Sequence, residues 1–186
     1  PLLKQEYPEV VAAARLTPVG PLLSRGDRHV NAGAAYWADP EVFDIFTFEP
    51  LAGELQTALA EPFRLTLSAS KVQALFGSDV PASDVVGQTV IVNNEHAFVV
   101  TGVFEDLPAN THLPIDMMGS MATMESWFGP LGWESPNYST YLLLAEGASP
   151  GSLARKLPDF LRTQRGADVA RQNRLHLQPL TDIHLR

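Results

Sequence analysis

The chain has 186 residues, of which 45% are hydrophobic and 18% are charged, a composition typical of a folded protein of one domain or two small ones. Thirteen basic against twenty-one acidic side chains give a net charge of −8, which argues against nucleic-acid binding because phosphate recognition requires a basic surface. The chain has no cysteine, which excludes disulfides and thiolate metal sites.

The sequence contains no membrane-spanning or targeting segment. No stretch reaches the roughly 20 apolar residues that a membrane helix needs. The N-terminal sequence PLLKQEYPEV has neither an initiator methionine nor the apolar region of a signal peptide. We therefore expect the chain to be an excised part of a larger protein.

The first fifty residues are expected to alternate between short helices and strands. A short helix ends near Tyr7-Pro8, and the apolar residues 10–19 either extend it or form a strand. A strand is predicted near residues 29–37. Asp39-Pro40 is typical of a helix start, with aspartate as N-cap and proline at the first helical position.

The middle of the chain has the clearest local patterns. Residues 63–67 alternate as in a strand, and the helical spacing that follows stops at Gly77. Two runs with strand character, separated by Asn93-Asn94-Glu95, predict a β-hairpin. Further elements are a helix at 55–60, the hairpin strands at 89–92 and 97–104, a helix at 118–128 and a Gly/Pro-rich loop at 129–136.

The last fifty residues are expected to form a strand, a helix and a strand. The first strand covers residues 138–144. Ser149-Pro150 opens a helix with an apolar stripe, and Pro158 predicts a kink or break inside it. The final strand lies near Leu175 and Leu177.

One polar segment follows the predicted hairpin and contains Glu105, Asp106, His112 and Asp116. Three acids and a histidine this close together are compatible with a metal site or an acid/base pair. However, the sequence DLPANTH has the proline, asparagine and threonine that form turns, and no second histidine lies nearby. A structural turn is therefore the favoured interpretation.

Ser68 and Lys71 in SASK match the spacing of serine–lysine acyl enzymes. The accompanying S-D-N and K-T-G tripeptides are absent, so we expect Ser68 to cap the next helix instead.

The strongest candidate for a contact surface is a cluster of methionines and aromatic residues. Methionine is common both in cores and on surfaces that bind varied partners, so the cluster is interpreted either as a core-facing helix, which is favoured, or as an exposed patch for a partner or cargo. Its members are Met117, Met118, Met121, Met124, Trp127, Phe128 and Trp133.

Six of the thirteen basic residues lie in the last helix and the loop after it. They form either a solvated helix face, which is favoured, or a contact with lipid headgroups or an acidic partner. They are Arg155, Lys156, Arg162, Arg165, Arg171 and Arg174.

Several segments together resemble the MacB-like periplasmic core domain of FtsX-type ABC transporter permeases. They are YWADPEVFDIFTFEPLAGE, LSASKVQALFG, VVGQTVIVNNEHAFVVTGVFEDLPANTHLPIDM and LHLQPLTDIHL, and the resemblance runs from about Tyr7 to Leu185. It implies a mixed α/β (α+β) fold. A porter-like α/β subdomain would form from residues 1–48 and 137–186, with residues 49–136 inserted as a smaller subdomain of β-hairpins and short helices.

The resemblance also implies a function. The domain would lie on the periplasmic face of the bacterial inner membrane, between the first two transmembrane helices of a permease. It would be non-catalytic and without cofactor or metal. A separate cytoplasmic ATPase would drive its movement, called mechanotransmission, and it would contact a periplasmic adaptor, a lipoprotein or a peptide cargo. We expect the isolated domain to be a monomer, and the full transporter a dimer.

Two alternatives remain. An extracytoplasmic ligand-binding sensor would need a pocket with converging polar groups, for which the methionine and tryptophan cluster is the candidate lining. An enzyme would need a nucleophile–base or metal constellation, and the sequence offers only weak motifs.

Overall fold

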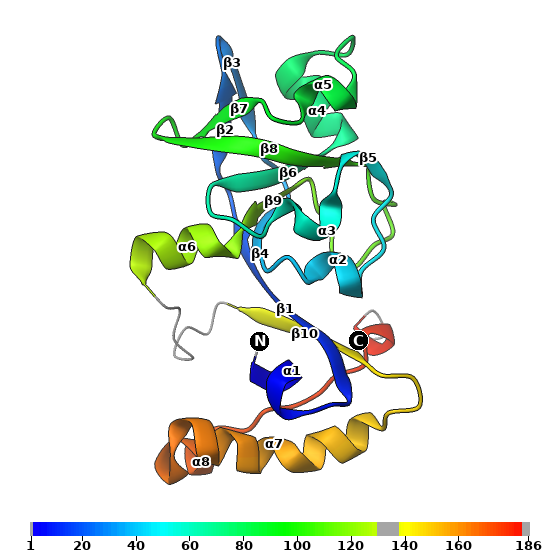
Figure 1. Cartoon of the computed structure of the whole chain (residues 1–186), viewed down its shortest axis with the longest axis vertical. Coiled ribbons are helices and arrows are strands. Elements are labelled where there is room, and N and C mark those ends of the chain that lie inside the picture. The colour runs from blue at the N-terminus through cyan, green and yellow to red at the C-terminus, as the bar shows by residue number, and fades with distance from the viewer. Residues whose placement is uncertain (1, 130–137, 184–186) are drawn as a thin grey trace. The chain divides into compact units, whose positions relative to one another are not determined.

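The structure, a computed structural model, describes residues 2–129 and 138–183, in which strands alternate with short helices (Figure 1). The elements in chain order are α1 (Leu2–Glu6), β1 (Val10–Val19), β2 (Leu22–Arg25), β3 (Arg28–Asn31), β4 (Ala35–Ala38), α2 (Val42–Ile45), β5 (Pro50–Gly53), α3 (Leu55–Ala58), β6 (Arg64–Ser68), α4 (Ala69–Phe76), α5 (Ala82–Val85), β7 (Thr89–Val92), β8 (His96–Phe104), β9 (Met117–Ser120), α6 (Met121–Phe128), β10 (Ser139–Leu144), α7 (Pro150–Arg165), α8 (Ala167–Gln172) and the 3₁₀ helix η1 (Leu180–Asp182).

The strands form a mixed sheet in the order β10-β1-β4-β9-β6-β8-β7-β2-β3, with β5 paired to β8. β4 pairs with β9 and β6 with β8 in parallel, whereas β1–β4, β6–β9 and β7–β8 are antiparallel. A mixed sheet with helices confirms the predicted fold class. The predicted β7–β8 hairpin is also confirmed: it turns at Asn93 and Asn94, which both have positive φ.

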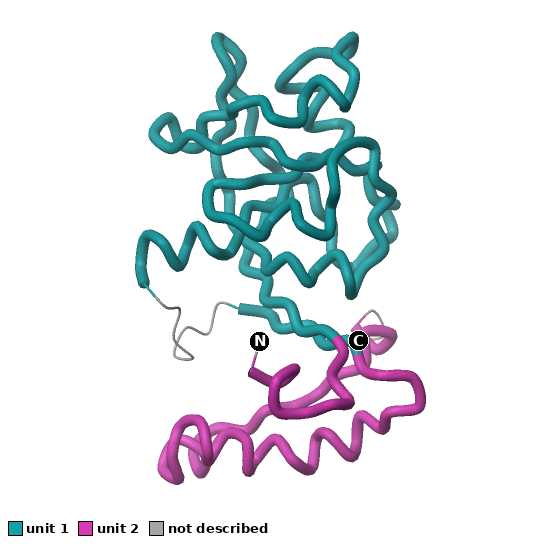
Figure 2. Tube along the Cα trace, viewed as in Figure 1, with its two compact units in different colours: residues 1, 12–143 teal, residues 2–11, 144–186 magenta. Residues whose placement is uncertain are grey.

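Contacts divide the described chain into two compact units (Figure 2). The larger unit contains residues 12–143, and the smaller unit combines residues 2–11 with those from 144 onward. Strand β1 leaves the smaller unit after Val11, and β10 enters it at Leu144. These bounds differ from the predicted ones at residues 48 and 136, and the division into a porter-like and an inserted subdomain stays a prediction.

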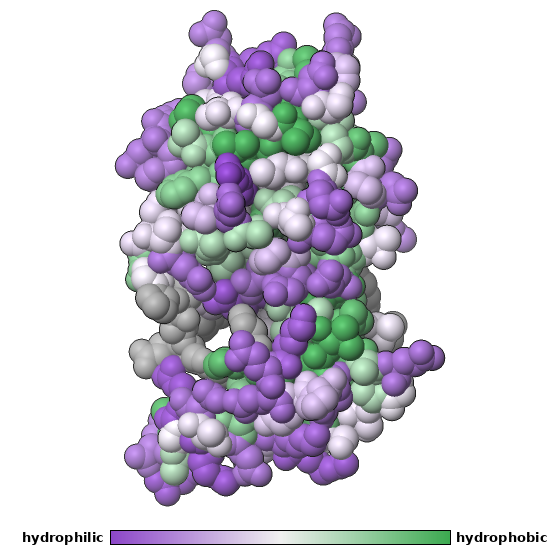
Figure 3. Space-filling view, in the orientation of Figure 1, coloured by the Kyte–Doolittle hydropathy of each residue, from purple (hydrophilic) through white to green (hydrophobic). Residues whose placement is uncertain are grey.

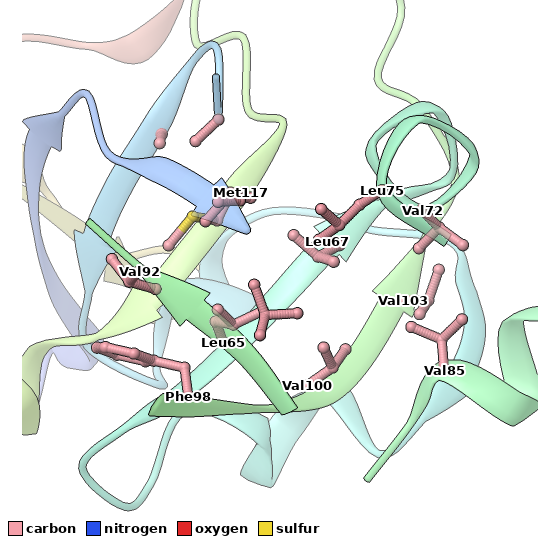
Figure 4. Packing of buried hydrophobic residues seen from close by; sticks show 14 of the residues in the cluster. Leu65, Leu67, Val72, Leu75, Val85, Val92, Phe98, Val100, Val103 and Met117 are labelled. Atoms are coloured by element: carbon pink, nitrogen blue, oxygen red, sulfur yellow. The ribbon is translucent and has the colours of Figure 1, made fainter. Parts of the chain in front are cut away.

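Both faces of the sheet in the larger unit are covered by apolar side chains. One cluster gathers under α4 and α5, and the residues labelled in Figure 4 belong to it. The other contains residues of α2 and α3 with Phe104 and Met118. Because successive strand residues point to opposite faces, the neighbours Met117 and Met118 lie in different clusters, and both are fully buried. This double burial explains why β9 consists entirely of buried residues.

The smaller unit is organised around the amphipathic helix α7. Its apolar stripe is buried, and Phe160 packs edge-to-face on Tyr7 with ring centroids 5.9 Å apart. Ser149 caps the helix by accepting a hydrogen bond from Ser152 N at 3.3 Å, as its sequence predicts. Of the kink or break predicted at Pro158, the break is wrong: the helix continues to Arg165, because the apolar stripe spans the proline on both sides. A kink stays a prediction. The stripe consists of Leu153, Leu157, Phe160 and Leu161.

Several local predictions need correction. The strand predicted at 29–37 is interrupted at Ala32-Gly33-Ala34 and forms β3 and β4. The helix predicted at 118–128 begins only at Met121, because the preceding residues pair with β4 and β6. Asp39 is not an N-cap; its carboxylate binds Arg15 instead. No strand forms near Leu175, where the chain is irregular up to η1.

Among the helices that the structure describes, none is long and apolar enough to span a membrane.

Candidate partner-contact surface

The methionine and aromatic cluster divides into buried and exposed parts. Met117, Met118 and Met121 are at most 1% exposed, so they are core residues and cannot contact a partner. Met124 and Trp127 are half-buried, and Phe128 is 72% exposed. Trp133 lies outside the described residues. Of the predicted contact residues, the structure therefore leaves the C-terminal end of α6 accessible.

Helix α6 is positioned by buried hydroxyl groups at its start. The Ser120 hydroxyl donates to Leu59 O at 2.7 Å and accepts from Ala122 N at 3.2 Å, so it both caps the helix and holds it to the segment after α3. The Thr123 hydroxyl accepts a hydrogen bond from Phe63 N at 2.8 Å. Ser120 and Thr123 are both fully buried. Sequence reasoning missed these two contacts, because they join segments about sixty residues apart.

Trp127 anchors the other end of α6 through aromatic contacts. Its ring lies 4.6 Å from the ring of His96 and packs edge-to-face on Trp37 at 5.8 Å. It also contacts Phe63 at 5.9 Å. Phe128 touches Trp127 at 6.3 Å and otherwise projects outward. Trp127 is therefore a packing residue with one accessible side, whereas Phe128 belongs to the surface.

A charged contact holds the outer side of α6. Arg15 Nη2 lies 2.7 Å from Asp39 Oδ1 and 3.0 Å from Glu125 Oε1, and Arg15 Nε donates to Asp39 Oδ2 at 2.8 Å. The hydrogen bond to Asp39 raises the pKa of Arg15, which burial alone would lower. This guanidinium is permanently charged and links β1, the residue after β4 and α6.

The side chains of the predicted acid and histidine segment are engaged in separate contacts within the chain. Asp106 Oδ1 accepts from Ser70 N at 3.1 Å, and Asp116 Oδ2 accepts from Ala34 N at 2.9 Å. His112 lies instead against the rings of Phe46 and Tyr141. Within residues 2–129 and 138–183, no three histidine, aspartate or glutamate side chains are placed to hold a metal ion. The segment is a structural turn fastened at both ends.

Ser68 and Lys71, the predicted serine–lysine pair, each have other partners. Ser68 stands at the N-cap position of α4 but makes no cap bond, and its hydroxyl lies 3.1 Å from Ser70 Oγ. Lys71 Nζ lies 3.6 Å from Asp116 Oδ2, against the backbone of Gly33, which has a positive φ of 75°. A side chain at Gly33 would overlap the Asp116 carboxylate. The lysine is thus part of an ion pair with Asp116.

Three of the six basic residues near the C-terminus form ion pairs within their own unit. Lys156 pairs with Glu9, and Arg162 pairs with Asp159 at 2.8 Å. Arg171 pairs with Asp168. These ion pairs favour a solvated helix face, and contact with lipid headgroups or an acidic partner stays a prediction.

An open pocket of about 420 Å³ lies elsewhere in the larger unit. Its lining includes Glu54, Glu61, Arg64 and Thr101, and none of the methionine and tryptophan cluster. Arg64 is already paired with Glu61 at 2.6 Å.

Solved structures of similar fold come from transporter proteins. A domain assigned to a permease protein of Porphyromonas gingivalis is 26% identical, with a TM-score of 0.75 over 95% of this chain and 79% of that one. The periplasmic region of MacB from Actinobacillus actinomycetemcomitans is 19% identical, with a TM-score of 0.66 over 90% and 72% of the two chains. The extracellular domain of the ABC-type transporter YknZ from Gram-positive bacteria is 14% identical, with a TM-score of 0.64 over 89% and 82%.

No curated protein matches the chain. The family model of the MacB-like periplasmic core domain matches residues 1–160. This match covers most of the chain and agrees with the fold of the solved structures. The chain therefore belongs to the family of MacB-like periplasmic core domains.

Proposed function

We propose that this domain is a non-catalytic periplasmic module of an ABC transporter permease that contacts cargo or partner proteins and transmits ATP-driven conformational change. A separate cytoplasmic ATPase drives the movement through the membrane domain. The observation that carries the proposal is the double connection between the two units: the neighbouring strands β1 and β10 each run from one unit into the other.

Two hydrogen-bonded strands are suited to carry a displacement. β1 pairs with β4, β4 pairs with β9, and β9 ends at Ser120, the cap of α6. A movement of β1 is therefore applied to a continuous sheet whose side chains are packed on both faces, and such interiors transmit strain because they have low compressibility. The α6 end, with Phe128 exposed, lies at the far end of this series of contacts.

The proposed non-catalytic character is supported by the internal partners of the polar groups. Lys71 is paired with Asp116, and Asp106 accepts a hydrogen bond from the Ser70 amide, so both charges are engaged by partners within the chain. A ligand sensor is less well supported, because the lining of the open pocket contains none of the described residues of the methionine and tryptophan cluster, which was its candidate lining.

Energy transfer to the membrane tests the proposed transmission. The chain has no cysteine, so Ala74→Cys in the larger unit and Thr163→Cys in the smaller unit provide single exposed labelling sites in this domain. Each is introduced separately into the full permease with its ATPase in lipid nanodiscs containing acceptor lipids. We expect the transfer efficiency to differ between the nucleotide-free and the ATP-bound state at one or both positions. If the transfer efficiency is the same in the nucleotide-free and the ATP-bound state at both positions, transmission to this domain is contradicted.

The control is an ATPase variant that cannot bind nucleotide. With this variant, adding ATP should leave the transfer efficiency unchanged at both positions. A change that persists reports an effect of ATP on the lipids or the fluorophore and counts against the proposal.

A further inference from the structure

The end of α6 presents aromatic rings to solvent. Phe128 is 72% exposed, far more than Leu51 or Leu180, which are both 42% exposed. The half-buried ring of Trp127 contacts Phe128, with ring centroids 6.3 Å apart, and the tilted ring of His96, at 4.6 Å. We call these three residues the α6 aromatic surface.

Carboxylates border this surface. Glu95, with a side chain 75% exposed, lies 3.7 Å from His96 Nε2. Glu125 is one helical turn before Phe128, with its side chain 42% exposed. Its partner Arg15 is only 19% exposed and also binds Asp39, so that guanidinium is held behind the surface and not offered to a ligand.

The larger unit as a whole is negatively charged, like the carboxylates around the α6 aromatic surface. Residues 12–143 contain five basic and fifteen acidic side chains, a net charge of −10, whereas the rest of the chain has eight basic and six acidic ones. The face drawn in Figure 3 is mostly hydrophilic, and hydrophobic residues show there in smaller patches. A partner that approaches the larger unit therefore meets a negative field, which speeds association with positive surfaces and repels anionic ones.

We infer that the α6 aromatic surface binds a basic segment of a partner protein, with arginine or lysine side chains against the exposed ring of Phe128 and paired with Glu95. Aromatic faces attract cations through their quadrupole, and a neighbouring carboxylate adds a Coulombic attraction of the same sign. An anionic lipid surface or an acidic segment is repelled by the same groups. This inference rests on the proposed function, because it assigns a partner chemistry to the contact surface of that proposal.

Direct binding to a defined probe tests the inference. The probe is a short fluorescein-labelled peptide that alternates arginine with glycine, compared with the same peptide carrying glutamate in place of arginine. Binding to the chain is followed by fluorescence anisotropy, and the site by NMR of the indole N–H groups. We expect saturable binding of the arginine peptide alone, with a larger shift of the Trp127 indole signal than of the Trp37 signal, because Trp37 is buried.

Matched variants locate the binding. Phe128→Ser removes the exposed ring, and we expect a two- to fivefold weaker affinity, about the contribution of a cation–π contact at an exposed site. Glu95→Gln should weaken binding about twofold. Leu51→Ser and Glu49→Gln change an exposed apolar and an exposed acidic residue in the same unit and should leave the affinity unchanged. Equal urea midpoints for Phe128→Ser and Leu51→Ser confirm that the comparison is made between folded proteins.

Three outcomes overturn the inference: equal binding of the glutamate peptide, an unchanged affinity in Phe128→Ser, or equal losses in Glu95→Gln and Glu49→Gln, which indicate unspecific attraction. Each of them leaves the nucleotide-dependent energy transfer as a separate result. If the peptide experiment contradicts a basic partner, the proposed transmission is unaffected. If the energy transfer does not change with nucleotide, transmission is contradicted independently of the peptide result.

Discussion

The backbone N–H of Phe63 donates a hydrogen bond of 2.8 Å to the buried hydroxyl of Thr123, which joins the residue before β6 to α6. Phe63 has φ 58°, a left-handed conformation that is unusual for a bulky aromatic residue. Its ring is held by Phe98 at 5.5 Å and by Trp127 at 5.9 Å. The strained backbone and α6 are thus mutually dependent, because each supplies contacts that fix the other.

Thr123→Val should destabilise the chain. The valine has nearly the shape of threonine but leaves Phe63 N–H without its acceptor, so we expect a loss of about 1–3 kcal/mol in the free energy of unfolding. Thr123→Ser retains the hydroxyl and should recover most of the hydrogen-bond contribution. Urea unfolding followed by far-UV circular dichroism measures both. A Val variant as stable as the parent would show that this hydrogen bond is not important for holding α6.

Trp127→Ala and Phe128→Ala should differ in stability, because the first ring is packed and the second is exposed. The rings packed around Trp127 predict a loss of stability of about 2–4 kcal/mol for Trp127→Ala. Phe128→Ala should change stability by less than about 0.5 kcal/mol because its ring is exposed. Thermal unfolding by calorimetry checks both. Equal losses at the two positions contradict this division of the cluster.

Gly119→Ala should be strongly unfavourable. A Cβ atom at Gly119 would overlap the indole ring of Trp37, which is buried among β-strands, and overpacking of this kind costs about 1–3 kcal/mol. Gly151→Ala is the matched control, since its Cβ would meet nothing nearer than Ser149 Oγ at 3.8 Å. Alanine there favours the first turn of α7 and should stabilise by up to about 1 kcal/mol. Opposite shifts of the urea midpoint are expected; a neutral Gly119→Ala would refute the close approach.

Asp106 should make stability depend on acidic pH. Burial opposes ionisation of its carboxyl group, but hydrogen bonds from the Ser70 amide and hydroxyl and from the Ser68 hydroxyl outweigh it and lower the pKa. Because the folded pKa is the lower one, the stabilisation is fully present above the unfolded carboxyl pKa of about 4 and is lost as pH falls through the folded value. Asp106→Asn should therefore reduce the loss of stability between about pH 6 and pH 2.

The control for this pH dependence is Glu105→Gln, which removes the exposed neighbouring carboxylate. The loss of stability of this variant as the pH falls should match that of the parent chain. Unfolding by urea at a series of pH values distinguishes the two variants. If the Asn variant loses as much stability at acidic pH as the parent chain, Asp106 is excluded as the cause of the pH dependence.

Elements fixed by neighbouring residues were predictable. The turn at Asn93 and Asn94, the end of α4 at Gly77 and the cap of α7 at Ser149 all depend on residues within a few positions of each other. The family was also predictable, since its segments lie in order along the chain. The break expected at Pro158 was not found, because the apolar stripe packs on both sides of the proline.

For the candidate contact surface, the sequence predicted the segment but not which of its residues are exposed. Its composition marked residues 117–128 as unusual, but helical spacing did not distinguish Met118, which is a strand residue, from Phe128, which is exposed. The partners of Asp39 and Asp116, which are Arg15 and Lys71, lie more than twenty residues away along the chain, so their ion pairs had no local signal.

By itself, then, the sequence determined the family, the fold class and the elements whose signals are local, because turn chemistry and hydrophobic period act between near neighbours. Tertiary structure alone decided which methionines are buried, that Thr123 holds Phe63, and that Phe128 is left at the surface. These outcomes depend on which strands pair and which face of each is covered, and pairing between distant segments is set by packing of the whole chain.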